Sequence, residues 1–301
     1  RRHAPSPSRP ARHGYPLVEN HELNLLSLFK GITPLPAINF NYSQTSADSS
    51  QYGSGVTFNT ISAREFARFT PATLGLGDIS RDGAYAQTLA AFFDLEGFTD
   101  FCGQVDSHLV IPEFLTRYLN WLFKSLAGEF RESERDGTVR LWGCLPFYAK
   151  FLGDGILFLW ATDLCRGFPG KVNIAQSLLA ITNAYVGGFL ADIRRAVSNP
   201  PARLRCGIAL GQTISIGGGA DYVGSCINVA SRLQKLGTLS FAISRRGFDL
   251  EESPDCQGSL RSYLTLKQTA IRSIGKQELV YIRRDEFEAL SADEQKEFRE
   301  P

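Results

Sequence analysis

From about residue 84 onward, the chain alternates strand-length apolar runs with segments of helical spacing. The run 89–93 is apolar throughout and has the length of a buried strand. A helix is predicted over 110–130, because apolar residues recur there every three or four positions. A second helix is predicted over 174–197, ending before a Pro-Pro pair that cannot continue it. This alternation predicts an α/β or α+β sandwich with an antiparallel component.

The clearest local signal is an Asp-Gly dipeptide at 154–155, between apolar segments 147–151 and 156–160. Such a dipeptide between two strands is typical of a β-hairpin turn. Later residues predict a strand at 204–210, a short partner strand at 213–216, a flexible triple-glycine turn at 217–219, and a helix at 228–236.

With 301 residues, 43% of them hydrophobic, the chain can bury one main core and a smaller appendage. The opening residues combine Pro, Ser and Arg with little apolar content, which favours disorder. The expected parts are a disordered tail at 1–20, an N-terminal extension of unknown role at 21–83, a main domain at 84–284, and a charged, solvated C-terminal helix at 285–301. Within the extension, a short helix is predicted near 25–29 and an extended segment at 53–61.

Basic and acidic residues are nearly balanced, 32 against 31, and spread along the chain. This balance predicts no nucleic-acid or membrane partner. No apolar window approaches the roughly 18 to 20 residues of a membrane span, and residues 1–14 lack the apolar stretch of a signal peptide, so a cytoplasmic location is expected. The six cysteines are far apart, which predicts buried thiols rather than a zinc site.

Two carboxylates stand where an apolar strand gives way to a turn, Asp94 after 89–93 and Asp154 after 147–151. If these strands are neighbours, the two acids share one end of the sheet. Carboxylates converging without histidines suit Mg²⁺ or Mn²⁺, held together with phosphate oxygens. The alternative is that each aspartate only supports its own turn.

Asn228 and Arg232 lie four residues apart in the predicted helix 228–236. They would project from the same face of that helix and could address one ligand together. As an isolated pair they could equally be surface residues.

Three segments resemble the signature segments of class III adenylyl and guanylyl cyclases, in the same order: 92–99 (FFDLEGFT), 150–155 (KFLGDG) and 224–232 (GSCINVASR). The resemblance extends over about 84–283, roughly two thirds of the chain. It implies an α+β fold, a ferredoxin-like, palm-type βαββαβ sandwich with an N-terminal extension.

The resemblance implies conversion of a nucleoside triphosphate to a 3′,5′-cyclic nucleotide and pyrophosphate. Asp94, Asp154 and the backbone carbonyl of Leu95 would bind two Mg²⁺ or Mn²⁺ ions per site. Asn228 would orient the ribose and Arg232 would stabilise charge on the α-phosphate, both supplied by the other subunit of a homodimer. Isolated monomers should then be inactive.

For the β- and γ-phosphates, the resemblance favours a basic residue near the end of the domain. The first choice is Lys276, in the segment 273–277 (SIGKQ), and the second is Arg272. The match to the family needs a one-residue shift at this point.

Within the resemblance, Lys150 and Asp221 occupy positions that go with adenine. A lysine can donate to a ring nitrogen and a carboxylate can accept from the exocyclic amine, so ATP is the first choice. The loop 217–221 is short and glycine-rich, which leaves the direction of Asp221 open. GTP also stays open, as do CTP and UTP, which related soluble bacterial cyclases use in anti-phage signalling.

Two rival hypotheses belong to other classes. An inactive cyclase-like module that only dimerises or binds nucleotide should lack part of the constellation, yet both acids and the Asn/Arg pair are present. A GGDEF-type diguanylate cyclase or polymerase palm also uses two acids and two metals. The Gly-Gly-Asp/Glu-Glu-Phe turn of the former is absent from 152–156.

Overall fold

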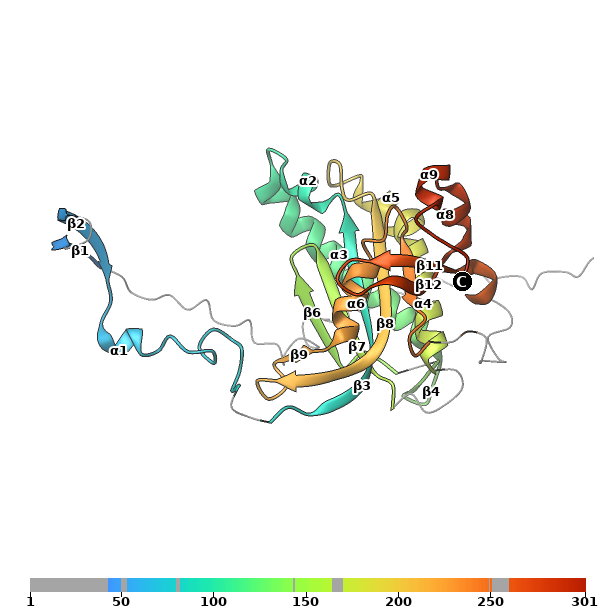
Figure 1. Ribbon diagram of the computed structural model, residues 1–301, viewed down its shortest axis with the longest axis horizontal. Coiled ribbons are helices and arrows are strands. Elements are labelled where there is room, and N and C mark those ends of the chain that lie inside the picture. The colour runs from blue at the N-terminus through green and yellow to red at the C-terminus, as the bar shows by residue number, and fades with distance from the viewer. Residues whose placement is uncertain are drawn as a thin grey trace, which may run out of the picture. The chain divides into compact units, whose positions relative to one another are not determined.

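The computed structural model describes residues 43–49, 53–79, 82–142, 144–163, 170–248, 250 and 260–301 (Figure 1). It divides into two compact units, Arg1–Gly75 and Leu76–Pro301. The predicted tail at 1–20 and the predicted helix at 25–29 lie outside the described residues.

In the first unit, two antiparallel strands, β1 (Ser43–Ser49) and β2 (Gly53–Thr60), form a small sheet. A one-turn helix follows, α1 (Ala63–Phe66), whose N-cap Ser62 accepts a hydrogen bond from the backbone N–H of Glu65. Strand β2 confirms the extended segment predicted over 53–61.

The second unit is built on one mixed sheet. Its strands are β3 (Tyr85–Glu96), β6 (Tyr148–Leu152), β7 (Gly155–Ala161), β8 (Arg203–Ile216), β9 (Asp221–Val223), β10 (Phe241–Ser244), β11 (Leu264–Ile271) and β12 (Gly275–Arg283). The spatial order is β11-β12-β10-β8-β3-β7-β6, with β9 paired to the far part of β8. The β10–β8 pair is parallel and the other pairs are antiparallel.

Helices connect these strands and cover both faces of the sheet (Figure 1). They are α2 (Phe98–Cys102), α3 (Ser107–Phe130), α4 (Gly170–Ala184), the π-helical turn η2 (Tyr185–Phe189), α5 (Leu190–Ile193), α6 (Ser225–Leu233), α7 (Leu260–Tyr263), α8 (Arg284–Ala289) and α9 (Ala292–Gln295). A separate hairpin joins β4 (Arg131–Arg135) to β5 (Thr138–Leu141).

The chain order β3-α3-β6-β7-α4-β8, with sheet order β8-β3-β7-β6, is the βαββαβ arrangement of a ferredoxin-like fold. It confirms the expected α+β class.

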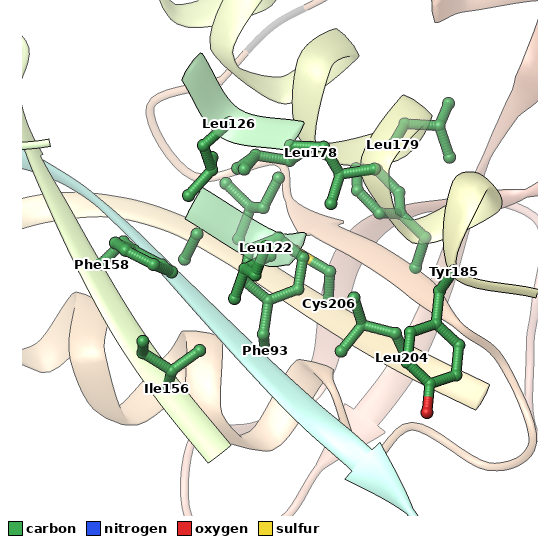
Figure 2. Close-up of a cluster of buried hydrophobic side chains, with 14 of the residues drawn as sticks. Phe93, Leu122, Leu126, Ile156, Phe158, Leu178, Leu179, Tyr185, Leu204 and Cys206 are labelled. Atoms are coloured by element: carbon green, nitrogen blue, oxygen red, sulfur yellow. The ribbon is translucent and has the colours of Figure 1, made fainter. Parts of the chain in front are cut away.

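The sheet has a core on each side, because side chains of β3 alternate between its faces. Phe93 packs with Leu122 of α3 and with α4 (Figure 2). Phe92 packs with Ala230 of α6 on the other side. By the same alternation, Asp94 lies on the face that α6 covers, which fixes the side on which a site can form.

Strand β8 is longer than predicted. Residues 213–216 are not a separate partner strand, because β3 begins at Tyr85 and pairs with β8 as far as Ile214. The partner of this part of β8 is β9, reached through a turn in which Gly217, Gly218 and Gly219 all have positive φ. A Cβ atom on Gly217 would also overlap the carbonyl oxygen of Leu76, so glycine is required there by both conformation and space.

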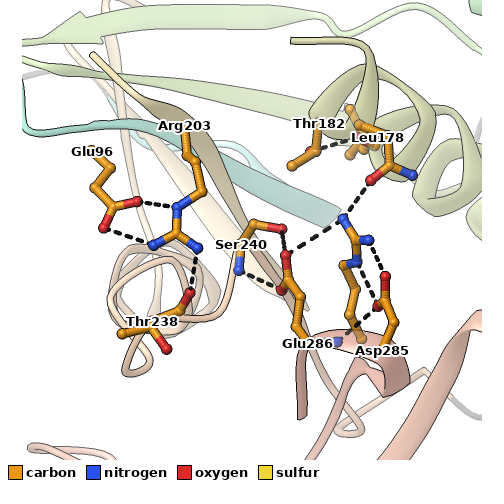
Figure 3. Close-up of polar contacts among 10 residues, drawn as sticks. Glu96, Leu178, Thr182, Arg203, Thr238, Ser240, Asp285 and Glu286 are labelled. Carbon is orange, nitrogen blue, oxygen red and sulfur yellow. Dashed lines mark hydrogen bonds and ion pairs between the residues drawn. The ribbon is translucent and has the colours of Figure 1, made fainter. Parts of the chain in front are cut away.

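The C-terminal segment forms two short helices where one charged helix was predicted. Ser291 begins α9 with a capping box, which ends the preceding turn. Glu286 is not simply solvated, since it accepts hydrogen bonds from the backbone N–H and hydroxyl of Ser240 (Figure 3). Phe298 is buried with the α6 side of the core.

The structure differs from two sequence expectations, that the cysteines are buried thiols and that no apolar window has the length of a membrane span. Cys206 and Cys226 are buried free thiols and Cys102 is a partly exposed one, but Cys144 is disulfide-bonded. The helical run Gly170–Ile193 is long and apolar enough to cross a membrane by length and composition, and 56% of its most apolar window is buried in the protein. It packs as a core helix against the sheet.

Candidate functional site

Asp94 lies near the end of β3, with its backbone between Gly155 of β7 and Arg205 of β8. Its side chain is only 6% exposed, and its Oδ1 atom is buried without a hydrogen-bond partner in the described part of the chain. Burial, followed by the negative charge of Asp154, raises its pKa from 3.8 to about 6, against the opposing charges of Lys235 and Arg205. A buried carboxylate oxygen without a partner is costly, so this position suits a bound cation.

Asp154 lies in the turn between β6 and β7. Its backbone carbonyl accepts a hydrogen bond from the N–H of Leu95 at 3.3 Å, which holds the turn against the end of β3. The charge of Asp154 also raises the pKa of Asp94. The contact and this effect show that the structure brings the two predicted acids to one end of the sheet.

The donor set fits a divalent cation of the Mg²⁺ or Mn²⁺ type. Within the described ranges, no group of three or more His, Cys, Asp or Glu side chains could hold a metal. Mg²⁺ needs no such cage, because it is commonly held by one or two carboxylates together with substrate phosphates. The side chain of Leu95 is buried in the core facing α3, so only its backbone could take part.

Glu96 is engaged by two arginines (Figure 3 shows its contact with Arg203). Arg203 donates through Nε to Glu96 Oε2 at 2.5 Å and through Nη2 to Oε1 at 3.1 Å, and Arg205 Nη2 lies 2.5 Å from the same Oε1. Although burial opposes the change, these hydrogen bonds lower the pKa of Glu96. Glu96 is therefore a neutralised carboxylate, whereas Asp94 beside it is not.

Arg205 was not among the predicted site residues. It faces Asp94 across the β3–β8 pair and its charge helps to keep that carboxylate ionised. Its Nε atom is buried without a partner in the part of the chain that the structure describes. The sequence signal was two basic residues, 203 and 205, alternating in a strand whose other positions are mostly apolar.

Asn228 and Arg232 lie on the exposed side of α6, while Val229, Ala230 and Leu233 pack against the sheet. Neither polar side chain has a hydrogen bond or ion pair with any described residue, Asp94 and Asp154 included. The pair shares one helical face, as predicted, and that face is free to meet another molecule.

Lys150 of β6 and Asp221 of β9 are brought together as an ion pair. The hydroxyl of Tyr148 and the backbone N–H of Tyr222 each donate to Asp221 Oδ1, both at 2.8 Å. Burial opposes it, but the hydrogen bonds from Lys150 and Tyr148 lower the pKa of Asp221. Tyr148 was not predicted as a site residue, although it lies two positions before Lys150 on the same side of the strand.

Arg272, in the turn between β11 and β12, and Lys276, the second residue of β12, are both exposed. Ile271 and Ile274, next to them in sequence, pack in the same core as α6. The turn therefore lies on the α6 side of the sheet, and the geometry does not favour either residue over the other.

The buried carboxylate gives a stability prediction. Because the pKa of Asp94 is raised in the folded protein, its charge destabilises the fold above about pH 6, and this cost disappears below about pH 4. Asp94→Asn should therefore raise the free energy of unfolding by up to about 3 kcal/mol at pH 8 in EDTA, and by almost nothing at pH 4. Urea denaturation at both pH values measures this. Exposed Asp100→Asn is the control, and an equal gain at both pH values would contradict the burial argument.

Comparison with known proteins identified solved structures that are similar to this chain. No family model matches the chain, and no curated relative matches it. The adenylyl cyclase CyaB from P. aeruginosa is similar at 17% identity and TM-score 0.49, covering 68% of this chain and 99% of that one. The guanylyl cyclase Cya2 is similar at 16% identity and TM-score 0.47, covering 67% and 94%.

A third similar structure is the catalytic core of a rhodopsin-guanylyl cyclase with converted specificity, in complex with ATPalphaS. It is 14% identical with a TM-score of 0.44, covering 67% of this chain and 98% of that one. These three structures carry the names of adenylyl and guanylyl cyclases.

Proposed function

We propose that this chain is a nucleotidyl cyclase that converts a nucleoside triphosphate, ATP first, to a 3′,5′-cyclic nucleotide and pyrophosphate. The observation that carries the proposal is the pair Asp94 and Asp154 at one sheet end, with the buried Oδ1 of Asp94 lacking a partner among the described residues. Such an arrangement is unfavourable in an inert turn and favourable around cations that arrive with a triphosphate.

In this proposal Asp94, Asp154 and the Leu95 carbonyl hold two Mg²⁺ or Mn²⁺ ions. When bound, these ions would lower the pKa of the ribose 3′-hydroxyl and neutralise the triphosphate and the departing pyrophosphate. Glu96 stays neutralised by Arg203 and Arg205, so it does not compete for the ions. The protein's own part is mainly positioning, and no side-chain general base is needed.

The other half of the site comes from a second copy. Asn228 would hold the ribose so that its hydroxyl lies near the α-phosphorus, and Arg232 would stabilise charge on the α-phosphate. Lys276, or else Arg272, would bind the β- and γ-phosphates. The support for this arrangement is that Asn228 and Arg232 are exposed and unpaired within the described chain. A homodimer would then carry two shared sites.

ATP is the first choice of substrate because Lys150 and Asp221 offer a donor and an acceptor side by side. These match an adenine ring nitrogen and its exocyclic amine. GTP, CTP and UTP are the alternative substrates.

The test is turnover of each nucleotide. Purified protein with Mn²⁺ or Mg²⁺ and, separately, ATP, GTP, CTP and UTP should release pyrophosphate and one dominant 3′,5′-cyclic product, identified by mass spectrometry. No turnover of any triphosphate, with wild type and Asp94→Ala binding nucleotide alike, would favour the inactive module instead.

A further inference from the structure

Tyr148 is built into the cluster that the proposed function assigns to the base. It lies in β6, and its hydroxyl donates to Asp221 Oδ1 at 2.8 Å. Its ring meets the ring of Tyr222 edge to face, with centroids 4.8 Å apart. Tyr148 is partly buried, and burial together with the bond to Asp221 raises its pKa, so its hydroxyl remains a donor at neutral pH.

The bonds around Asp221 leave it little capacity to accept more. A carboxylate has about four lone-pair positions, two on each oxygen. Oδ1 already accepts from Tyr148 and from the backbone N–H of Tyr222, and Oδ2 accepts from Lys150. One position therefore remains, on Oδ2 beside the Lys150 ammonium, which itself has donors to spare.

Because one acceptor position remains on Asp221, a base that presents one N–H group to this carboxylate can be satisfied, whereas a base that presents two cannot. Adenine offers one amino group beside a ring nitrogen that can accept from Lys150. Guanine offers two adjacent N–H groups, on N1 and on its 2-amino group, which a fully available carboxylate would accept together. With Oδ1 occupied, one of these guanine donors would be desolvated without a partner, which binding sites reject strongly.

We propose that Tyr148 is a specificity-determining, positioning residue, which discriminates against guanine by occupying Oδ1 of Asp221. The inference rests on the proposed function, since it requires the base to face this cluster. It adds a residue to that function, because Lys150 and Asp221 alone would leave Oδ1 free to accept a second N–H group.

The experiment compares kcat/KM for ATP and GTP in wild type, Tyr148→Phe and the control Tyr222→Phe. Wild type should prefer ATP. Tyr148→Phe keeps the ring but frees Oδ1, so the ATP/GTP preference should fall by about tenfold, chiefly through a lower KM for GTP. Tyr222→Phe leaves the backbone N–H bond in place and should keep the wild-type ratio.

The outcomes are distinct. An active enzyme whose Tyr148→Phe variant keeps the wild-type ratio, or loses activity equally with both nucleotides, overturns the role of Tyr148 and leaves the proposed function intact. A wild type that prefers GTP overturns the role of Tyr148 even if the variant does not fold. A wild type that turns over no triphosphate overturns both proposals.

Discussion

Replacing Asp94 by Asn should lower kcat by about 10³-fold or more with Mn²⁺ and ATP, while the protein remains folded. The amide has nearly the same shape as the carboxylate but no charge to hold a divalent cation. Losing such charge stabilisation costs several kcal/mol at the transition state. Initial rates of pyrophosphate release measure the change.

The matched control is Asp100→Asn, which changes an exposed carboxylate in α2 six residues further on. It should keep the wild-type rate within about twofold, as surface substitutions usually do. If Asp94→Asn retained most of its turnover, Asp94 would not be a metal ligand. Its raised pKa would then reflect only burial and the nearby charge of Asp154.

The sequence predicted most of the sheet end that carries the two acids, because the signals there are local. The apolar run ending at Asp94 fixes a buried strand, and the Asp-Gly dipeptide fixes the turn at Asp154. The same dipeptide, Asp136-Gly137, joins β4 to β5 with positive φ at both residues, yet that hairpin was not predicted. Its first strand, β4, consists only of polar residues, and β5 has four residues, so the hairpin lacks the long apolar runs that marked the other one.

The sequence could not predict the roles of Arg205 and Tyr148, because both depend on register and on distant partners. Arg205 helps to keep Asp94 ionised because β3 and β8, which are far apart in the sequence, pair and place the two residues opposite each other. Tyr148 matters because β9 brings Asp221 to it, 73 residues later. Glu96 belongs to the signature-like segment, but only the structure shows that two arginines already neutralise it.

For Asn228 and Arg232, the sequence and the structure each supply one part of the location. Their helical spacing was predicted, and the structure places both on the side of α6 that faces away from the core. The acids, in contrast, lie at the end of β3 with Asp94 almost fully buried. In the proposed function, the sheet would hold the acids and α6 would present Asn228 and Arg232 to a second copy, which completes the site.

Mixing two inactive variants should restore turnover if the sites are shared in this way. Asp94→Asn lacks an acid and Arg232→Ala lacks the outward-facing cation, so each homodimer has two defective sites. A heterodimer has one site with both defects and one intact site. After subunit exchange in an equal mixture, half of the dimers are mixed, so about a quarter of the wild-type rate should return.

The control mixture is Asp94→Asn with Asp154→Asn, measured under the same exchange conditions. Both acids belong to the same half of a site, so every site in every dimer keeps one defective acid and no activity should return. Recovery in this control would assign the two acids to different copies, against the contact between the Leu95 N–H and the Asp154 carbonyl. No recovery in the first mixture, with dimers present by light scattering, would mean that each chain completes its own site, and Arg232 would lose its proposed role in trans.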